Sequence, residues 1–253
     1  MADISRAAGH ASRPAGRSAH PSRPNAIAFD LWNTLIESDE SSPSRGNARL
    51  LELAGCDASL DALLAFEAGL LRDIEQREDE GHLEFTRQSL QRLLNDRFAI
   101  RSPLSLAEQE WEYWSAAMSI RLVDGVTEAL DDLARRSIRR VVISNSNFIA
   151  GTIERTLADL GVLDRFEFVV SSADYGVRKP HPAIFAAALA RLGLAPGEVW
   201  FAGDNIAYDL KGGLAAGMYT VLFRPPDDEP PGIEGYARIE RWSDLAVLLD
   251  RAG

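Results

Sequence analysis

The sequence predicts an α/β fold, a doubly wound parallel sheet with an all-helical segment inserted near its start. Short apolar runs alternate with amphipathic stretches from about residue 126 to the end of the chain. Strands that alternate with helices form βαβ units, and such units build a parallel sheet covered on both faces. In contrast, residues 45–120 place apolar residues at helical spacing without a strand-like run. This stretch predicts a helical module between the first strand and the rest of the sheet.

The first predicted strand, residues 26–30, is a short apolar run that stops on an aspartate. Residues 37–44 are acidic, rich in serine and contain a proline, which predicts a linker. Residues 45–120 then place leucines three and four positions apart, as an amphipathic helix does. Pro103 interrupts this pattern, and residues 106–118 predict the last helix of the module.

In the second half of the chain, short apolar runs predict the further strands. They are residues 141–143, 168–170, 199–201 and 219–223. The stretches beside them show helical periodicity or many alanines, and they predict the helices that cover the sheet. These are residues 126–136, 149–160, 182–192, 210–216 and 242–249.

Composition and charge limit the partners of the chain. It has 253 residues and a net charge of -11, with an isoelectric point near 4.9. Nucleic acid and anionic membranes repel such a protein, so we expect neither as a partner. Cys56 is the single cysteine, which excludes an intramolecular disulfide. No apolar run reaches the about 18 residues that a membrane span needs. We expect a cytoplasmic protein, either a monomer or a homodimer.

Residues 1–24 differ in composition from the rest of the chain. They are rich in Ala, Ser, Gly and Pro, and they carry four arginines against a single acid, Asp3. A basic, serine-rich segment is compatible with a transit peptide. Because this one has too few apolar residues to build a core, we predict a disordered leader.

Polar side chains follow several predicted strands at the point where each strand ends. They are Asp30 and Thr34, then Ser144 and Asn145, and finally Asp204 and Asp209, with Lys179 on a loop between the last two groups. The carboxyl ends of parallel strands meet at one edge of a sheet, where open α/β proteins bind ligands. Carboxylates gathered there repel one another unless a cation lies between them, and oxygen ligands suit Mg²⁺. Lys179 would offset the remaining charge, and Ser144 would donate a hydrogen bond to a bound anion.

Each of these residues also has an ordinary structural explanation. Ser144 can satisfy backbone groups at a strand end, and Lys179 can be a surface charge. Asp204 can belong to a turn, and Asp209 can start a helix, where the helix dipole favours an acid. These explanations do not account for the residues occurring together, in this order, at strand ends.

This order of residues resembles the haloacid dehalogenase (HAD) superfamily of hydrolases over about residues 27–223. The first motif of the family, D-x-D-x-T, is similar to D-L-W-N-T at residues 30–34. The second, an apolar strand that ends in Ser or Thr, is similar to residues 141–144. The third is a lysine in a K-P-x-P context, as at residues 179–182, and the fourth is G-D-x-x-x-x-D, as at residues 203–209. The helical insertion resembles the C1-type cap of the family.

The resemblance implies a division into domains. Residues 25–40 and 121–253 would form a Rossmannoid α/β core, and residues 41–120 would form the helical cap. The cap would close over the site and exclude water. Trp111 and Trp114 share one face of the last predicted cap helix, and we expect them to pack the interior of the cap.

The resemblance also implies a mechanism. Asp30 would be the nucleophile and form a covalent aspartyl intermediate. Mg²⁺ would be held by Asp30, the backbone carbonyl of Trp32, Asp204 and Asp209. Ser144 and Lys179 would bind the phosphoryl group that is transferred, with Thr34 in support. The substrate, a small phosphorylated metabolite, would contact Trp32, Asn33, Asn145 and Lys179.

Trp32 departs from the pattern of the family. Its phosphatases usually carry at this position an Asp that protonates the leaving group, and an indole has no such acidity. Loss of a general acid typically costs about 100- to 10,000-fold in rate. The metal contact is unaffected, because it uses the backbone carbonyl.

Three functions fit this sequence. The first is a Mg²⁺-dependent phosphatase that favours good leaving groups, such as acyl or aryl phosphates, or takes its acid from the cap or substrate. The second is a 2-haloacid dehalogenase-like enzyme, since these carry Tyr at the position of Trp32 and release halide unprotonated. They usually have Ser where this chain has Asp204, and they need no metal. The third is a non-catalytic phosphate-binding protein, which the retention of the other site residues disfavours.

Overall fold

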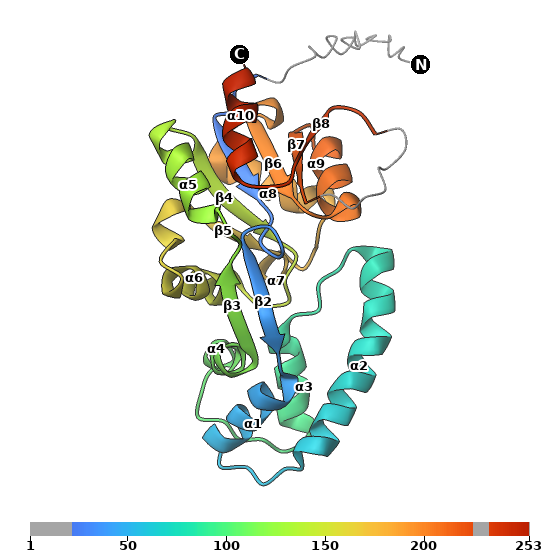
Figure 1. Cartoon of the computed structure of the whole chain (residues 1–253). Helices are drawn as coiled ribbons and strands as arrows, with labels where there is room; N and C mark the ends of the chain where they lie inside the picture. The colour runs from blue at the N-terminus through green and yellow to red at the C-terminus, as the bar shows by residue number, and fades with distance from the viewer. Residues whose placement is uncertain (1–21, 225–232, 253) are drawn as a thin grey trace, which may run out of the picture.

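The computed structural model describes residues 22–224 and 233–252, which form an α/β core and a helical segment beside it (Figure 1). Most of the leader predicted for residues 1–24 lies outside the described residues. Within the two described ranges, no helix is both long enough and apolar enough to cross a membrane.

A six-stranded parallel sheet forms the centre of the core, in the order β5-β4-β1-β6-β7-β8. The strands are β1 (Ala26–Phe29), β4 (Arg139–Ser144), β5 (Val169–Ser171), β6 (Val199–Gly203), β7 (Tyr219–Phe223) and β8 (Tyr236–Ile239). The chain moves outward from β1 to β5 and then returns to β6 on the other side of β1. This reversal opens a crevice at the carboxyl ends of the central strands. The doubly wound fold is therefore confirmed, and β8 is a strand that the sequence pattern did not predict.

The two faces of the sheet have separate hydrophobic cores, because alternate residues of a strand point to opposite faces. Ile27 and Phe29 of β1 pack in the cluster that holds residues of α5, α6 and α10. Ala26 and Ala28 pack in the cluster formed with α8. The helices are α5 (Val126–Arg135), α6 (Ala150–Asp159), α8 (Pro182–Leu192), α9 (Lys211–Ala215) and α10 (Ser243–Arg251). Both faces of the sheet are thus covered, as the alternating pattern predicts.

Short helices complete the core. They are α7 (Ser172–Tyr175), the 3₁₀ turns η1 (Leu163–Arg165) and η2 (Pro196–Glu198), and the π-helical turn η3 (Ile206–Leu210). The π-helical turn η3 runs directly into α9, where the sequence pattern predicts a helix from residue 210.

The inserted segment is helical, as predicted, with α1 (Pro43–Leu53), α2 (Leu60–Gly81), α3 (Arg87–Arg97) and α4 (Leu106–Ala117). Each helix begins after a Ser or Thr whose side chain accepts a hydrogen bond from a backbone N–H of the first turn. Leu63, Leu90 and Leu94 contribute to a hydrophobic cluster of its own. The segment therefore buries apolar surface independently of the sheet.

Two predictions about the ends of the inserted segment are wrong. Most of residues 37–44 form a strand rather than a linker, and the last helix gives way to a strand at residue 118. Strand β2 (Ile36–Ser41) pairs antiparallel with β3 (Met118–Leu122). The ribbon is largely solvent-exposed, and Arg121 forms ion pairs with Glu37 and Asp39 across it. After Ile36, β2 consists of polar residues and lacks the alternation that identifies a half-buried strand. Strand β3 does alternate, but it directly follows α4 with no turn signal between them. The proline of the expected linker instead occupies the first turn of α1, where its missing N–H costs nothing.

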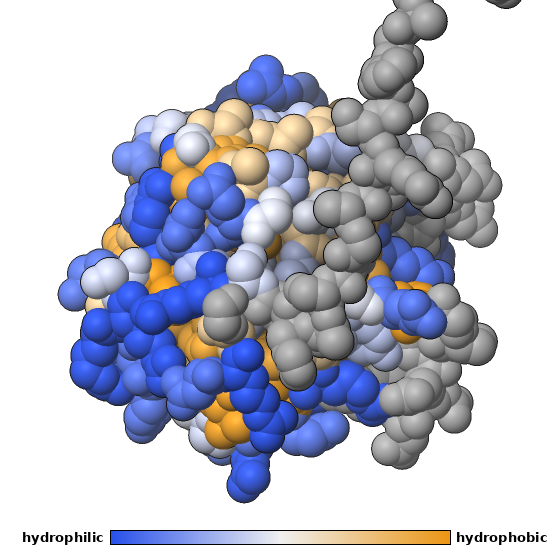
Figure 2. All heavy atoms as spheres, turned by 90° about the horizontal axis from the view of Figure 1, so that it is seen from above, coloured by the Kyte–Doolittle hydropathy of each residue, from blue (hydrophilic) through white to orange (hydrophobic). Residues whose placement is uncertain are grey.

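The β2–β3 ribbon joins the inserted helices to the core. The division into a core of residues 25–40 and 121–253 and a cap of residues 41–120 stays a prediction. On the face of the molecule seen in Figure 2, hydrophilic residues surround several smaller apolar patches.

Candidate active site

Asp30 directly follows β1 and begins a tight loop. Its backbone N–H donates to the carbonyl of Ala202 at 2.8 Å, which fixes it to the neighbouring strand. The loop closes on itself, because the N–H of Leu35 donates to the carbonyl of Leu31 at 2.8 Å. Asn33 adopts a left-handed backbone with φ of 55°, a conformation that Asn tolerates better than most residues.

The Asp30 carboxylate is buried and has two side-chain partners. The hydroxyl of Thr34 donates to Oδ2 at 3.2 Å, and Lys179 Nζ lies 2.5 Å from Oδ1. The same ammonium lies 2.7 Å from Asp209 Oδ1. Lys179 is only 1% exposed, so it is not a surface charge. The sequence-predicted lysine and two of the predicted acids therefore form one buried cluster.

Asp204 and Asp209 reach this cluster from the end of β6. Asp209 lies in η3. The Asp209 Oδ2 accepts a hydrogen bond from the Asn205 N–H at 3.0 Å, and this bond stabilises the turn. A Cβ on Gly203 would come within 2.5 Å of the Asp209 carboxylate, so this close approach requires glycine. Carboxylate oxygens of Asp30, Asp204 and Asp209 lie within 4.8 Å of one another. The three acids thus have the spacing of a cation site.

The charges of the cluster are unbalanced, with three carboxylates around one ammonium. Burial raises the pKa of Asp30 from 3.8 to about 7; Lys179 opposes this rise and Asp209 adds to it. Burial, and then Asp209, also raise the pKa of Asp204, against a hydrogen bond from Asn33. Burial alone would lower the pKa of Lys179, but Asp209 and Asp30 outweigh it and the pKa is raised. A divalent cation among these oxygens would remove the repulsion that the single ammonium leaves.

Ser144 and Asn145 lie at the end of β4, beside β1. The Ser144 side chain is fully buried, and its hydroxyl has no hydrogen-bond partner among the described residues. Asn145 holds the backbone of Lys179 from both sides. Its Nδ2 donates to the Lys179 carbonyl at 3.0 Å, and its Oδ1 accepts from the Lys179 N–H at 2.7 Å. Asn145 therefore positions the lysine, and Ser144 keeps a hydroxyl free for a ligand.

Trp32 borders a cavity of about 340 Å³ next to these residues. The cavity is lined by Trp32, Leu71, Ile74, Glu84, Phe85, Asn145, Ser146, Asn147, Phe148 and Arg178. The Trp32 ring packs on Trp114 of α4 with a centroid distance of 5.7 Å, and Trp114 meets Phe148 at 4.6 Å. The expectation that Trp114 packs the interior of the cap is therefore wrong, because these two ring partners lie outside the inserted helices. It joins the inserted helices to the loop that carries Asp30.

Glu84 and Arg178 are charged residues of this cavity that were not among the predicted site residues. Arg178 Nε lies 3.8 Å from Glu84 Oε2, and the Arg178 N–H donates to the carbonyl of His82 at 2.9 Å. Leu83 and Val177 form an antiparallel bridge beside them. The position of Arg178 next to Lys179 is the only sequence signal for these contacts, because residues 82–84 and 176–178 meet through the tertiary fold.

The chain matches a family model and has relatives of known name. The model of the family "haloacid dehalogenase-like hydrolase" matches residues 24–217. The chain is similar to a ribulose-1,5-bisphosphate 5-phosphatase of Halopiger xanaduensis, 30% identical over 216 residues, 80% of this chain and 86% of that protein. It is also similar to a glyceraldehyde 3-phosphate phosphatase of Methanothermobacter thermautotrophicus, 28% identical, over 78% of this chain and 84% of that protein.

A solved structure shares the fold. It is a 2-haloacid dehalogenase of Pseudomonas syringae pv. Tomato DC3000, with a TM-score of 0.66 and 21% identity. The match covers 91% of this chain and all of that one. The fold is therefore common to proteins named for two different reactions, and the reaction has to be argued from the site.

Proposed function

The chain belongs to the haloacid dehalogenase-like hydrolase family, and we propose that it is a magnesium-dependent phosphatase acting on a small phosphorylated metabolite. One observation carries the proposal. The buried ammonium of Lys179 joins Asp30 to Asp209, and the Ser144 hydroxyl, at the end of the neighbouring strand β4, has no hydrogen-bond partner among the described residues. A nucleophile, a cation and a hydrogen-bond donor thus lie at the same edge of the sheet, and phosphoryl transfer requires all three.

The residues fit a magnesium ion. The donors are carboxylate oxygens, which this hard cation prefers over nitrogen or sulfur, and they lie close enough to share it. Asp30, Asp204 and the backbone carbonyl of Trp32 would hold the ion, with Asp209 assisting. Bound there, it would neutralise the oxygens of the phosphoryl group and keep Asp30 ionised.

Asp30 is the proposed nucleophile. Its carboxylate oxygen bonds to phosphorus as the bond from phosphorus to the leaving oxygen breaks, which gives an aspartyl phosphate. Water then attacks this phosphorus as its bond to the Asp30 oxygen breaks, which releases hydrogen phosphate and regenerates the carboxylate. One proton of the water stays on the phosphate, and the other passes through solvent to the oxygen of the departed group. Thr34 holds the other oxygen of Asp30 through the 3.2 Å hydrogen bond, so the attacking oxygen keeps its orientation.

Lys179 and Ser144 are the proposed ligands of the phosphoryl group. The ammonium stabilises charge on the phosphoryl oxygens, and the Ser144 hydroxyl gains the acceptor that it lacks among the described residues. Asn145 contributes by fixing the Lys179 backbone from both sides. Positioning and charge neutralisation supply most of the catalysis in this class of reaction.

Trp32 shapes the choice of substrate. It offers no proton to the leaving oxygen, so departure is fastest for groups that leave as stable anions, such as aryl or acyl oxygens. The adjacent cavity offers the aromatic side chains of Trp32, Phe85 and Phe148. A planar leaving group would stack on these rings, and both features therefore favour an aryl phosphate over an alkyl phosphate. The phosphatase names of the two relatives support phosphoryl rather than halide chemistry.

A second candidate is hydrolysis of a carbon–halogen bond. The aromatic Trp32 favours it, because a halide leaves without a proton. The cluster of Asp204 with Asp30 and Asp209 disfavours it, since a metal-free reaction gains nothing from extra buried acids.

The test is an assay of the purified protein with p-nitrophenyl phosphate and acetyl phosphate, with Mg²⁺ and with a chelator. Halide release from 2-chloropropionate is measured beside it. We expect phosphate release that needs Mg²⁺ and no halide release. Halide release that persists in the chelator, without phosphate release, would contradict the proposed function.

A further inference from the structure

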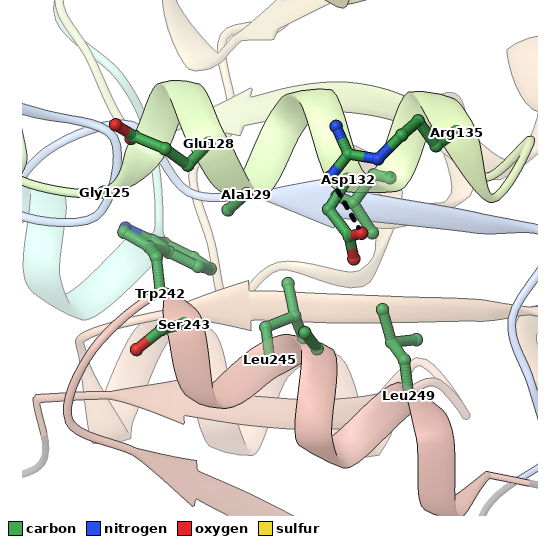
Figure 3. A pocket seen from close by; sticks show the side chains of 11 residues that line it. Gly125, Glu128, Ala129, Asp132, Arg135, Trp242, Ser243, Leu245 and Leu249 are labelled. Carbon is green, nitrogen blue, oxygen red and sulfur yellow. Dashed lines mark hydrogen bonds and ion pairs between the residues drawn. The ribbon is translucent and has the colours of Figure 1, made fainter.

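Trp242 lies at the start of α10, beyond the residues 24–217 that the family model matches. It is 1% exposed. Its ring stacks on Phe223 at a centroid distance of 4.6 Å and meets Phe29 edge-on at 5.5 Å. Figure 3 shows it at one end of a cavity of about 390 Å³ between α5 and α10. The ring is therefore held firmly on the side of the sheet that carries these helices.

The indole N–H of Trp242 reaches the loop of the nucleophile. It donates to the carbonyl of Thr34 at 3.1 Å, and the Thr34 hydroxyl donates to Asp30 Oδ2 at 3.2 Å. The carbonyl of Leu31 accepts from the N–H groups of Leu35 and of the next residue, the first of β2. The carbonyl of Leu35 accepts from the N–H of Val123. The Thr34 carbonyl instead depends on a donor 208 residues away in sequence.

We propose that Trp242 is a positioning residue for the reaction, which fixes the loop of residues 30–35 through the Thr34 carbonyl. This inference rests on the proposed function. Phe29 directly precedes Asp30 and packs on the same ring, so Trp242 holds the loop at two points. It thereby controls where the Thr34 hydroxyl holds Asp30 and where the backbone carbonyl of Trp32 faces.

Removal of the indole N–H leaves the Thr34 carbonyl buried without its donor. The loop can then shift to satisfy the carbonyl elsewhere, and the Asp30 oxygen moves with it. A displacement of about 1 Å at a reacting atom can cost about a hundredfold in rate. Binding of the phosphoryl group is affected less, because Ser144 and Lys179 come from other elements of the core.

The experiment compares Trp242→Phe with a matched control, Trp200→Phe. Trp200 is also 1% exposed, packs on an aromatic ring and donates its N–H to a backbone carbonyl, that of Ser22 at 3.2 Å. Its hydrogen bond lies outside the loop of the nucleophile. We expect Trp242→Phe to lower kcat for p-nitrophenyl phosphate by about ten- to a hundredfold with KM little changed. Trp200→Phe should keep kcat while losing a similar amount of thermal stability.

Equal kcat in the two variants would overturn the inference, whether both keep the rate of the wild type or both lose it. Should Trp242→Phe fail to fold, the wild-type protein is labelled with ¹⁵N-tryptophan and titrated with Mg²⁺ and inorganic phosphate. The Trp242 indole resonance should then shift while that of Trp200 stays, and an unchanged Trp242 resonance would contradict the proposal. A wild-type protein without phosphatase activity would contradict the proposed function itself, whereas an active one with full kcat in Trp242→Phe contradicts this inference alone.

Discussion

A cluster of buried charged side chains among the inserted helices and another at the sheet differ in how their charges are matched. In the first, Arg87 Nη1 lies 2.5 Å from Glu67 Oε1. Asn47 donates to the other oxygen of Glu67 at 2.5 Å. Arg87 Nη2 donates to Asn47 at 3.0 Å and to Gln91 at 2.7 Å, and its guanidinium covers the Tyr113 ring. One positive and one negative charge are thus balanced and surrounded by amides, although Arg87 Nε has no hydrogen-bond partner among the described residues.

The second cluster has an excess of acid. Lys179 pairs with Asp30 and Asp209, and Asp204 adds a third carboxylate close to these two. Burial raises the pKa of Asp30 to about 7, and the Ser144 hydroxyl has no partner among the described residues. Balanced buried charges stabilise one arrangement of the helices and need no ligand. Unbalanced buried charges persist at a cost in stability, which a bound cation and anion would remove. The contrast separates a cluster with an architectural role from one suited to binding.

The largest effect is expected from Asp30→Asn. The variant keeps the shape of the side chain and removes the nucleophile, so kcat should fall by about a thousandfold or more. The matched change in the other cluster is Glu67→Gln, which should lower stability and leave kcat near that of the wild type. Phosphate release and thermal unfolding of both variants test this. Turnover retained in Asp30→Asn would show that the acid at the end of β1 is not the nucleophile.

The balance of the first cluster is tested by Arg87→Met. The change leaves Glu67 as an uncompensated buried charge, and loss of one partner of such a pair costs about 3–5 kcal/mol in the free energy of unfolding. The double variant Arg87→Met with Glu67→Gln removes both charges and should recover part of the loss. Denaturant unfolding measures both. If the double variant were no more stable than Arg87→Met, the balanced-pair description would be wrong.

The imbalance of the second cluster predicts a pH dependence of stability without metal. Because the pKa of Asp30 is raised to about 7 from 3.8, the unfolded chain loses this proton first as pH rises. The free energy of unfolding should therefore fall between these two values, on the order of a few kcal/mol, and this contribution is constant above them. Thermal unfolding in a chelator measures the slope. Asp30→Asn and saturating Mg²⁺ should each flatten it, and a slope unchanged in both would contradict the account of the cluster.

The smallest effect is expected from Trp32→Asp. An acid at this position can protonate a poor leaving group, so hydrolysis of ethyl phosphate should rise relative to phenyl phosphate by about tenfold, less than the full effect of a general acid. The ratio of the two kcat/KM values is the measurement. An unchanged ratio would mean that another group already supplies the proton, and Glu84 in the adjoining cavity would then be the first residue to replace.

The sheet and the site could be predicted because each depends on a local signal. The strands β4, β6 and β7 are apolar runs, and the residues of the second cluster follow strand ends at fixed spacing. Strand β8 was not predicted, because Tyr236–Ile239 is short and includes an arginine, so it does not form an apolar run. Strand β2 was not predicted because every residue after Ile36 is polar, and β3 was not predicted because its alternating residues directly follow a helix without a turn signal.

Contacts between distant segments could not be predicted. Nothing local in the sequence indicates that Trp114 packs on Trp32, or that Arg87 pairs with Glu67 across the inserted helices. The same holds for Trp242 and Thr34, which are 208 residues apart. Such pairs are set by how the elements pack, so they became visible only in the folded chain.

The central claim is that Asp30 carries the phosphoryl group during turnover. The most direct measurement is acid quenching of the protein shortly after mixing with acetyl phosphate and Mg²⁺, followed by mass spectrometry of its peptides. The account predicts one phosphoryl group on Asp30, absent in the chelator and absent from Asp30→Asn. Phosphate release at the same rate with the phosphoryl group on another residue would contradict it.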